Sequence, residues 1–494
     1  MSQPEPADPE DASEERSAHA PRRLRALAHR YTPHLPQSFQ DSINRWLLFG
    51  VVIGVVSGLG AVIFYWCLSH ATQWLLVGIG GYQPPTTVGE GSGLPNGAFT
   101  RPWAIPLVVT GGALVAGILV AWLAPEAEGH GTDAAIHAVH HDPTSLRGRV
   151  AVVKVIASSL VIGSGGSGGR EGPTAQISAT VIAQLCRWLK VPRQDARIAV
   201  SAAMGSGIGA IFRAPMGGAL LGAELLYRED MESDALMPSF VSSIVAFAVF
   251  GTFFGFRPIF GSHSAASFQH PVGLIWYACV GVAAGVAGRA YASIFYGGGA
   301  LLKRLPVPNA IRPAIGGLCV GLIGLAVPAA LGTGYGWIQL EMTSDWLLTT
   351  PLWLVLVIPL AKIVSTTLSI GSGGSGGVFG PGMVIGGCAG AAVWRLVHTL
   401  PGVTHDPMPY VIIGMIACFG SVAHAPIGVM LMVAEMTGNL TLLAPAMLAM
   451  AIATLIVDGK SIYISQLRDR FEYYSLRERG GSLGGHPLSP GPQP

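Results

Sequence analysis

The segment GSGGSGGREGP spans residues 163–173, and the nearly identical segment GSGGSGGVFGP spans residues 371–381. Each glycine-rich run follows an apolar segment and ends in Gly-Pro before another apolar segment begins. Proline is common in the first turn of a helix, so each run predicts a loop that leads into a helix N-terminus. Because glycine has no side chain, a ligand can approach the free backbone N–H groups of such a helix end closely. The two runs therefore predict two helix ends that can bind an anion.

The glycine-rich runs belong to a longer internal repeat. Lys154 and Lys362 each lie nine residues before the first glycine of a run. Further matches occur in the same order in both halves: Gly54 and Gly58 with Gly281 and Gly285, Gly111-Gly112 with Gly316-Gly317, GHG (129–131) with GYG (334–336), and RAPMGGALLGAE (213–224) with HAPIGVMLMVAE (424–435). The first half contains one additional polar loop, YQPPTTVGEGSGLPNGAF (82–99). We therefore predict two homologous halves, 41–254 and 270–470, joined by a connector at 255–269.

The composition indicates a membrane protein. The chain has 494 residues, of which 50% are hydrophobic and 11% are charged, whereas soluble proteins carry about 25% charged residues. Its mean hydropathy is +0.51. A net charge of +2 gives no indication of a nucleic-acid partner. Long apolar segments recur along the chain, and several approach the roughly 20 residues that span a bilayer core: 46–66, 104–124, 150–162, 236–254, 272–296, 310–331, 352–370 and 409–457.

These features predict an all-α polytopic protein of the cell membrane, expected in a bacterial inner membrane. Many of its glycine-rich segments are expected to be tilted or broken helices. Residues 1–40 contain no apolar core of a signal peptide and predict a disordered N-terminal tail, and 471–494 predict a disordered C-terminal tail. Basic residues beside the first and last apolar segments predict that both tails are cytoplasmic.

Arg170 and Glu171 are the unusual residues of the first run. The glycines alone could serve only to let helices pack closely. An ionisable pair at membrane depth is energetically costly, however, and usually marks a transport pathway. Glu171 would compete with an anion for the adjacent N–H groups, because its carboxylate could occupy the site when charged and leave it when protonated. Glu171 is therefore predicted to be a gate.

Three short segments resemble anion-site signatures of the CLC family of chloride channels and proton/chloride exchangers: GREGP (169–173), GVFGP (377–381) and GKSIYISQL (459–467). The segment FRAPMGGALLGAE (212–224) resembles the helix that follows the first signature. The resemblance covers about 41–470. It implies two inverted-topology repeats, a homodimer in the lipid bilayer with one pore per subunit, and chloride as the transported ion, with no cofactor or metal.

The resemblance also implies roles for individual residues. Glu171 matches the external gating glutamate, Val378 and Phe379 match residues whose backbone N–H groups bind chloride, and Tyr463 matches a tyrosine whose hydroxyl binds the same ion. The remaining candidates for the anion site are neighbours within these segments and the GHG motif: His130, Gly131, Arg170, Gly172 and Gly380.

Two positions depart from the family pattern. His130, in GHGTD (129–133), stands where the family usually has an anion-binding serine, and it is expected either to bind the anion or only to pack. Asp133 adds a negative charge nearby. Leu225 stands where exchangers have a proton-delivering glutamate, next to the shared structural Glu224. This change favours a passive, glutamate-gated chloride channel, although water and the acids at 229–230 leave a coupled proton/chloride exchanger as the alternative.

Other functional classes have weaker support. Neither glycine-rich run contains the lysine of a nucleotide-binding P-loop. An intramembrane protease would use Ser164, Ser167 and His130, but the second run repeats its serines without a catalytic partner. The chain is therefore expected not to be an enzyme. The segment HAVHHD (137–142) leaves a metal-ion transporter as a remote alternative, in which His137, His140, His141 and Asp142 would bind the metal.

Overall fold

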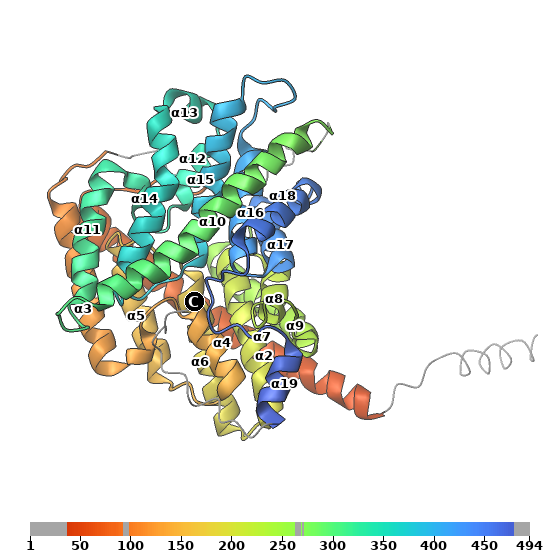
Figure 1. Ribbon diagram of the computed structural model, residues 1–494. Coiled ribbons are helices and arrows are strands. Elements are labelled where there is room, and N and C mark those ends of the chain that lie inside the picture. The colour runs from red at the N-terminus through yellow and green to blue at the C-terminus, as the bar shows by residue number, and fades with distance from the viewer. Residues whose placement is uncertain (1–36, 92–97, 262–267, 269–270, 479–494) are drawn as a thin grey trace, which may run out of the picture. The chain divides into compact units, whose positions relative to one another are not determined.

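A computed structural model describes residues 37–91, 98–261, 268 and 271–478, and these residues form helices joined by loops (Figure 1). In this part of the chain there is no strand, only isolated β-bridges. The elements are α2 (Gln37–Ala71), η1 (Thr72–Ile79), η2 (Val88–Glu90), α3 (Ala104–Leu123), η3 (Pro125–Ala127), α4 (Thr132–His141), α5 (Arg149–Gly163), α6 (Glu171–Trp188), α7 (Arg193–Phe212), α8 (Pro215–Glu224), α9 (Ser233–Phe254), α10 (Gly273–Lys303), α11 (Arg312–Ala326), η4 (Pro328–Ala330), α12 (Tyr335–Glu341), α13 (Ser344–Thr349), α14 (Leu352–Ile370), α15 (Phe379–Val397), α16 (Met408–Val422), α17 (Pro426–Thr437), α18 (Leu443–Val457) and α19 (Arg470–Glu478).

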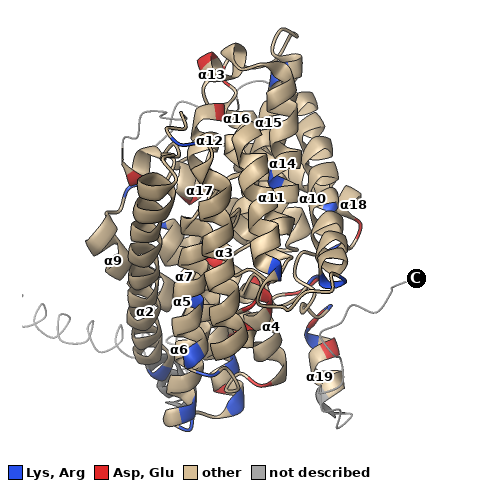
Figure 2. Cartoon of the chain, turned by 90° about the vertical axis from the view of Figure 1, so that its left-hand side faces the viewer, with Lys and Arg blue, Asp and Glu red and all other residues tan. Residues whose placement is uncertain are grey.

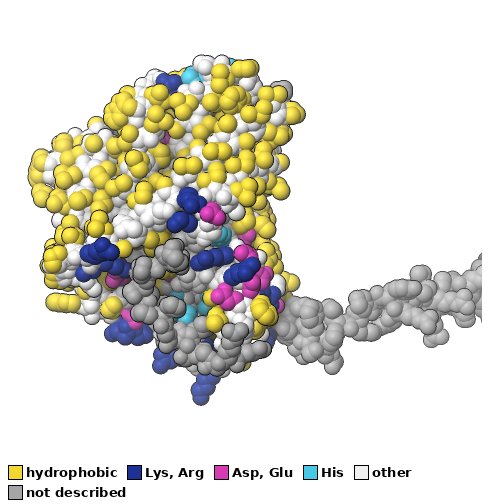
Figure 3. Space-filling view, viewed as in Figure 1, with side chains coloured by type: hydrophobic (Ala, Val, Ile, Leu, Met, Phe, Trp, Pro, Cys, Tyr) yellow, Lys and Arg dark blue, Asp and Glu magenta, His cyan; other side chains and the backbone are white. Residues whose placement is uncertain are grey.

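Six helical segments among the described residues are long and apolar enough to cross a membrane: Arg45–Ile79, Ala104–Leu123, Ser233–Phe254, Gly273–Lys303, Leu352–Ile370 and Phe379–Val397. Charged residues, blue and red on the ribbon in Figure 2, are sparse along the middle of the helices and more frequent toward their ends. The face drawn in Figure 3 is mostly hydrophobic, and its charged side chains cluster in the lower part. The predicted all-α polytopic membrane fold is confirmed.

Other apolar helices are too short to span a bilayer. The apolar stretch 409–457 forms the separate helices α16, α17 and α18. The chain turns between them at His424, with φ of 50°, and at Gly438, with φ of 60°. A helix of the 15 residues of α16 is about 22 Å long, whereas a bilayer core is about 30 Å thick. The prediction of partly broken helices is therefore confirmed in this region.

The matched glutamates of the two halves make reciprocal contacts. Glu224, at the end of α8, accepts hydrogen bonds from the backbone N–H groups at the start of α17, with 2.7 Å between its Oε2 and the nitrogen of Gly428. Glu435, in α17, accepts hydrogen bonds from the start of α8, with 2.8 Å between its Oε2 and the nitrogen of Gly217. Each carboxylate satisfies free donors of a helix N-terminus. Each half therefore caps a helix of the other half with an equivalent pair of hydrogen bonds.

The matched lysines make equivalent contacts, each within its own half. Buried Lys154 donates from Nζ to the carbonyl oxygens of Ala127 and Gly129, at 3.0 and 2.7 Å. Buried Lys362 donates to Ala330 and Gly332, at 3.3 and 2.7 Å. A charged ammonium buried in a membrane protein is tolerated only with such partners. Both lysines thus brace the loop that enters a short helix, α4 in the first half and α12 in the second.

The predicted tails fall mostly outside the described residues. Of the predicted N-terminal tail, only 37–40 are described, and they begin α2. Of the predicted C-terminal tail, 471–478 lie in the helix α19, so the prediction of disorder is wrong for these residues. Tyr473 anchors α19, because its ring lies 4.2 Å from the Arg197 guanidinium carbon. The predicted connector 255–269 lies between α9 and α10, and the domain limits themselves stay predictions.

Candidate anion site

The two glycine-rich runs meet where α6 and α15 begin. Gly169 and Gly377 form an antiparallel bridge in which each N–H donates to the other carbonyl oxygen, with 2.7 Å between nitrogen and oxygen in both bonds. Pro173 and Pro381 lie in the first turns of the two helices, as predicted. The bridge places both helix N-termini side by side within the protein interior. Two partial positive charges and several backbone donors therefore converge on one place.

The Glu171 carboxylate occupies this place. Its Oε1 accepts a hydrogen bond of 2.9 Å from the backbone N–H of Gly380, in the first turn of α15. Its Oε2 is buried and has no hydrogen-bond partner among the described residues. A Cβ atom at Gly169 or at Gly377 would collide with the carboxylate. The glycines of both runs are thus required for the approach of an anionic group to the backbone.

The second run supplies the other wall of the site. Val378 precedes α15, and Phe379 and Gly380 are its first two residues. The Val378 carbonyl oxygen accepts a hydrogen bond of 2.9 Å from the Tyr291 hydroxyl, which fixes the backbone of the run. The Phe379 ring packs against Phe419, with 4.0 Å between the ring centroids. The N–H groups at the start of α15 therefore belong to a rigid, buried segment.

His130 and Tyr463 lie together on a separate wall, with 5.7 Å between their ring centroids. The Tyr463 hydroxyl and the His130 Nδ1 are both buried without hydrogen-bond partners among the described residues. Buried polar atoms normally have hydrogen-bond partners. These two atoms are therefore available to bind a ligand or a water molecule. His130 also contacts the first run, because a Cβ atom at Gly172 would collide with its carbonyl oxygen.

Gly131 and Gly172 lie against each other through their backbones. A Cβ atom at Gly131 would be 2.6 Å from the Gly172 carbonyl oxygen and 3.0 Å from the Lys154 side chain. Gly131 also has φ of 80°, a conformation that favours glycine. These two predicted site residues are therefore close to the site and let the GHG loop pack against the first turn of α6.

Arg170 precedes Glu171 and is buried, but its side chain has partners of its own. One guanidinium nitrogen pairs with Glu90, in η2. The guanidinium also lies over the rings of Tyr65, Phe212 and Tyr335, at 5.3, 5.7 and 5.3 Å from their centroids. The additional polar loop of the first half thus supplies a counter-charge beside the first run. This pair could not be predicted from the sequence, because Glu90 is 80 residues from Arg170.

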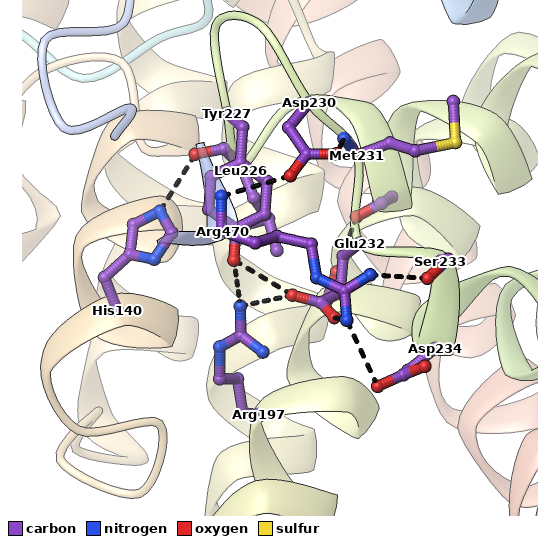
Figure 4. A network of polar contacts seen from close by, with 12 residues as sticks. His140, Arg197, Leu226, Tyr227, Asp230, Met231, Glu232, Ser233, Asp234 and Arg470 are labelled. Carbon is purple, nitrogen blue, oxygen red and sulfur yellow. Dashed lines mark hydrogen bonds and ion pairs between the residues drawn. The ribbon is translucent and has the colours of Figure 1, made fainter. Parts of the chain in front are cut away.

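Leu225 is buried where the exchanger pattern would place a glutamate. The two acids that follow are bound elsewhere: Glu229 pairs with Arg468 at 2.9 Å, and Asp230 accepts a hydrogen bond of 3.1 Å from the Arg470 backbone. Sequence reasoning missed Glu232, which is 1% exposed and pairs with Arg197. Figure 4 shows this pair with Tyr227 and Arg470.

A second acid that sequence reasoning missed is Glu341, at the end of α12. It is fully buried, and Cys388 is the side chain that lies within reach of its carboxylate. Its presence in the apolar segment GYGWIQLEM (334–342) was the available signal, since a buried acid in such a segment is uncommon.

The HAVHHD segment does not assemble a metal site in the described part of the chain, which contains no group of three or more candidate ligands. His137 and His141 stack, with 3.9 Å between their ring centroids. His140 turns away from them, and its Nε2 lies 2.9 Å from the Leu226 carbonyl oxygen (Figure 4). Asp142 accepts hydrogen bonds from Thr144. This geometry gives no support to the metal-transporter alternative.

Comparison with known proteins gives a family match. The family model described as "Voltage gated chloride channel" matches residues 112–458. The "Putative chloride channel protein ClcB-like" of Ralstonia nicotianae is 30% identical over 406 residues, which cover 81% of this chain and 90% of the relative.

Two solved structures show the same fold. A slow cyanobacterial Cl⁻/H⁺ antiporter aligns with a TM-score of 0.72 and 21% identity, covering 90% of this chain and 99% of that chain. A CLC-type fluoride/proton antiporter aligns with a TM-score of 0.71 and 19% identity, covering 86% of this chain and 98% of that chain.

Proposed function

Because the chain belongs to the voltage-gated chloride channel family, or CLC family, we propose that it transports chloride and similar small anions across a membrane. The anion would pass between the N-termini of α6 and α15 and then beside Tyr463 and His130. The observation that carries this proposal is the Glu171 carboxylate, which accepts the Gly380 N–H at 2.9 Å. A site that holds a carboxylate with backbone donors has the chemistry to hold chloride.

Glu171 acts in this proposal as the external gate. The carboxylate and a permeating anion carry the same charge and require the same N–H groups, so they exclude each other. Protonation removes the charge that holds the side chain at the helix ends. The side chain then leaves and the anion enters. Backbone dipoles suit this exchange because they attract an anion without a full opposing charge that would hold it too tightly.

Two modes of transport can use this site. In the passive mode, Glu171 only opens and closes the path, and Leu225 favours this mode because leucine cannot carry a proton. In the coupled mode, Glu171 also carries the proton in exchange for chloride. The names of the two structural relatives favour the coupled mode, since both are antiporters. Coupling would require water to bring the proton past Leu225, because the wall there is apolar.

Reconstitution into proteoliposomes tests the function and separates the modes. A chloride gradient is imposed, valinomycin and potassium hold the voltage at zero, and chloride and external pH are recorded together. Chloride efflux above that of empty liposomes supports the function, and its absence contradicts it. Efflux without proton movement identifies the passive mode, whereas proton uptake against its own gradient identifies exchange.

The assembly and orientation follow as further parts of the proposal. Large apolar side chains are exposed on α3, α9 and α10, including Trp122, Phe253 and Ile275, which suits contact with lipid or a second copy. A homodimer would give twice the chain mass in light scattering after subtraction of detergent. The basic residues near α19 favour a cytoplasmic location for the C-terminus, which protease protection in oriented vesicles would test.

A further inference from the structure

Asp133 is an acidic side chain close to the inner wall formed by His130 and Tyr463. It lies in the first turn of α4, three residues after His130. A negative charge near the path of an anion is unfavourable by itself. Its retention in such a place therefore requires a structural reason, which its hydrogen bonds provide.

Both carboxylate oxygens of Asp133 bind Ser465. The Ser465 backbone N–H donates to Oδ1, with 2.8 Å between nitrogen and oxygen. The Ser465 hydroxyl donates to Oδ2, with 2.7 Å between the oxygens. Hydrogen bonds to an ionised carboxylate are about twice as strong as those between neutral groups. The two residues are 332 positions apart, so this bidentate contact ties together the first and second halves.

The two segments joined in this way carry the two inner-wall side chains. Ser465 follows Tyr463 by two residues, and Asp133 follows His130 by three. The rings of His130 and Tyr463 lie 5.7 Å apart at their centroids. The contact between Asp133 and Ser465 therefore joins the two segments that carry these rings.

The other anchors of the Tyr463 segment lead to different elements. The Ile462 N–H donates to the carbonyl oxygen of Val422, at the end of α16, at 3.0 Å. The Gln466 side-chain nitrogen donates to Leu225 and Ala423 carbonyl oxygens, at 3.1 and 2.9 Å. These bonds hold the segment against α16 and α8. Asp133 adds a bond to α4, the helix that follows His130.

We propose that Asp133 is a positioning residue that sets the distance between His130 and Tyr463 and thereby the anion selectivity of the inner end of the path. Asp133 does not touch the anion; it acts through Ser465. The inference rests on the proposed function, since selectivity has meaning only if anions pass between the two rings. It also explains why an acid is tolerated here, because both oxygens face donors.

Three substitutions separate positioning from charge. Asp133→Asn removes the charge but keeps both contacts, because its amide oxygen accepts the Ser465 N–H and its amide nitrogen donates to the Ser465 hydroxyl. Asp133→Ala removes the charge and both contacts. Ser465→Ala removes only the hydroxyl contact and leaves the charge. Asp142→Asn is the matched control, because it neutralises an acid just beyond the other end of α4 and far along the helix from Tyr463.

The measurement is the ratio of chloride, nitrate and thiocyanate efflux from proteoliposomes that contain the full-length protein. Asp133→Ala is expected to change the thiocyanate-to-chloride ratio about tenfold, because it removes hydrogen bonds to a charged group. Ser465→Ala is expected to change the same ratio about threefold in the same direction, because it removes only one of the two hydrogen bonds. Asp133→Asn and Asp142→Asn are expected to stay within about twofold of the parent.

The outcomes are distinguishable. If Asp133→Asn changes selectivity as much as Asp133→Ala does, the charge is responsible and the positioning role is overturned. If Ser465→Ala has the same efflux ratios as the parent, the positioning of the two rings through the Asp133–Ser465 contact is also overturned. Should Asp133→Ala fail to give a single peak in size exclusion, these two milder variants still decide the question. Absence of anion efflux with the parent protein contradicts the proposed function. Anion efflux with the parent, together with unchanged efflux ratios in the Asp133 and Ser465 variants, contradicts only the positioning role of Asp133.

Discussion

The two glycine-rich runs, 163–173 and 371–381, have the same scaffold and different chemistry. Each ends at the start of a helix, and their bridge pairs Gly169 with Gly377 through two equal hydrogen bonds. The first run places Arg170 and Glu171 at the helix start, where the second has Val378 and Phe379. The backbone geometry was thus duplicated, whereas the ionisable groups are found in one copy.

This difference assigns separate tasks to the two helix ends. The start of α15 offers backbone donors and no side-chain charge, so it can accept an anionic group. The start of α6 supplies that group as Glu171, whose Oε1 lies 2.9 Å from the Gly380 nitrogen. The first half therefore carries the proposed gate, Glu171, and the second half carries the backbone N–H group that binds it. The predictions below alter one half at a time.

The largest effect is expected from Glu171→Gln. The amide is uncharged at every pH, so it mimics the protonated gate and cannot be drawn to the helix ends as a carboxylate is. Chloride efflux from proteoliposomes should lose its dependence on external pH between 5 and 8, at about the highest rate of the parent. In the passive mode, the rate alone changes; in the coupled mode, proton movement also stops.

Glu126→Gln is the control for this prediction. Glu126 is 42% exposed and pairs with Arg147 at the surface, far from the glycine-rich runs in sequence. A surface ion pair of this kind contributes about 0–1 kcal/mol, so the pH dependence should remain. If the Glu171 variant were as pH-sensitive as the parent, the gate would be elsewhere, and His130 would be the next residue to test.

Repetition made much of this architecture predictable from the sequence. Matched spacing identified Lys154 with Lys362 and Glu224 with Glu435 as equivalent pairs, and the structure gives each pair equivalent contacts. Gly-Pro after each run predicted a helix start, which α6 and α15 confirm. These predictions succeeded because glycine, proline and spacing act locally along the backbone.

Contacts between distant segments could not be predicted in this way. The apolar stretch 409–457 gave no boundary at His424, because the turn there requires a positive φ that histidine seldom adopts. The partners of Arg170 and Asp133 are Glu90 and Ser465, each of which comes from a distant loop. One sequence contains the charges but not their pairing, which depends on the tertiary arrangement.

A smaller effect is expected from Glu224→Gln and Glu435→Gln. Each carboxylate accepts two backbone N–H groups, whereas an amide presents one oxygen and turns its NH₂ group toward the other donor. Each variant should lose about 1.5–3 kcal/mol of stability, and the two losses should be similar. Thermal unfolding in detergent, followed by tryptophan fluorescence, measures them.

A marked difference between these two variants would show that the halves do not contribute equally. The double variant adds a second comparison. Since each glutamate caps the helix of the other half, the two contacts lie close together through α8 and α17. Neighbouring sites commonly couple, so the loss of stability in the double variant should differ from the sum of the two single losses.

Lys154→Met and Lys362→Met should separate stability from anion binding. Either change removes a buried charge but leaves two carbonyl oxygens without a donor. Each unsatisfied oxygen lowers the free energy of unfolding by about 1–3 kcal/mol. The easier burial of methionine partly offsets this loss. Lys154 braces Ala127 and Gly129, directly before His130, whereas Lys362 braces Ala330 and Gly332. Chloride affinity measured by calorimetry should therefore fall in Lys154→Met and stay near the parent in Lys362→Met. Equal chloride affinities in the two variants would contradict a role of the GHG loop (129–131) in chloride binding.

The smallest effect is expected from Tyr463→Phe, which removes one hydroxyl and keeps the ring. The hydroxyl is buried with only a weak contact to Thr132 among the described residues, so its removal breaks no strong internal hydrogen bond. If the hydroxyl binds chloride, the dissociation constant measured by calorimetry should rise about three- to tenfold, as expected for one neutral hydrogen bond. Stability without chloride should stay the same, because the Phe419 and His130 rings keep their neighbour.

Tyr291→Phe is the matched control from the other wall, since that hydroxyl donates to the Val378 carbonyl oxygen at 2.9 Å and its loss should lower stability more than affinity. Unchanged affinity in Tyr463→Phe would exclude Tyr463 as an anion ligand and leave the helix ends of α6 and α15 to bind chloride by backbone alone.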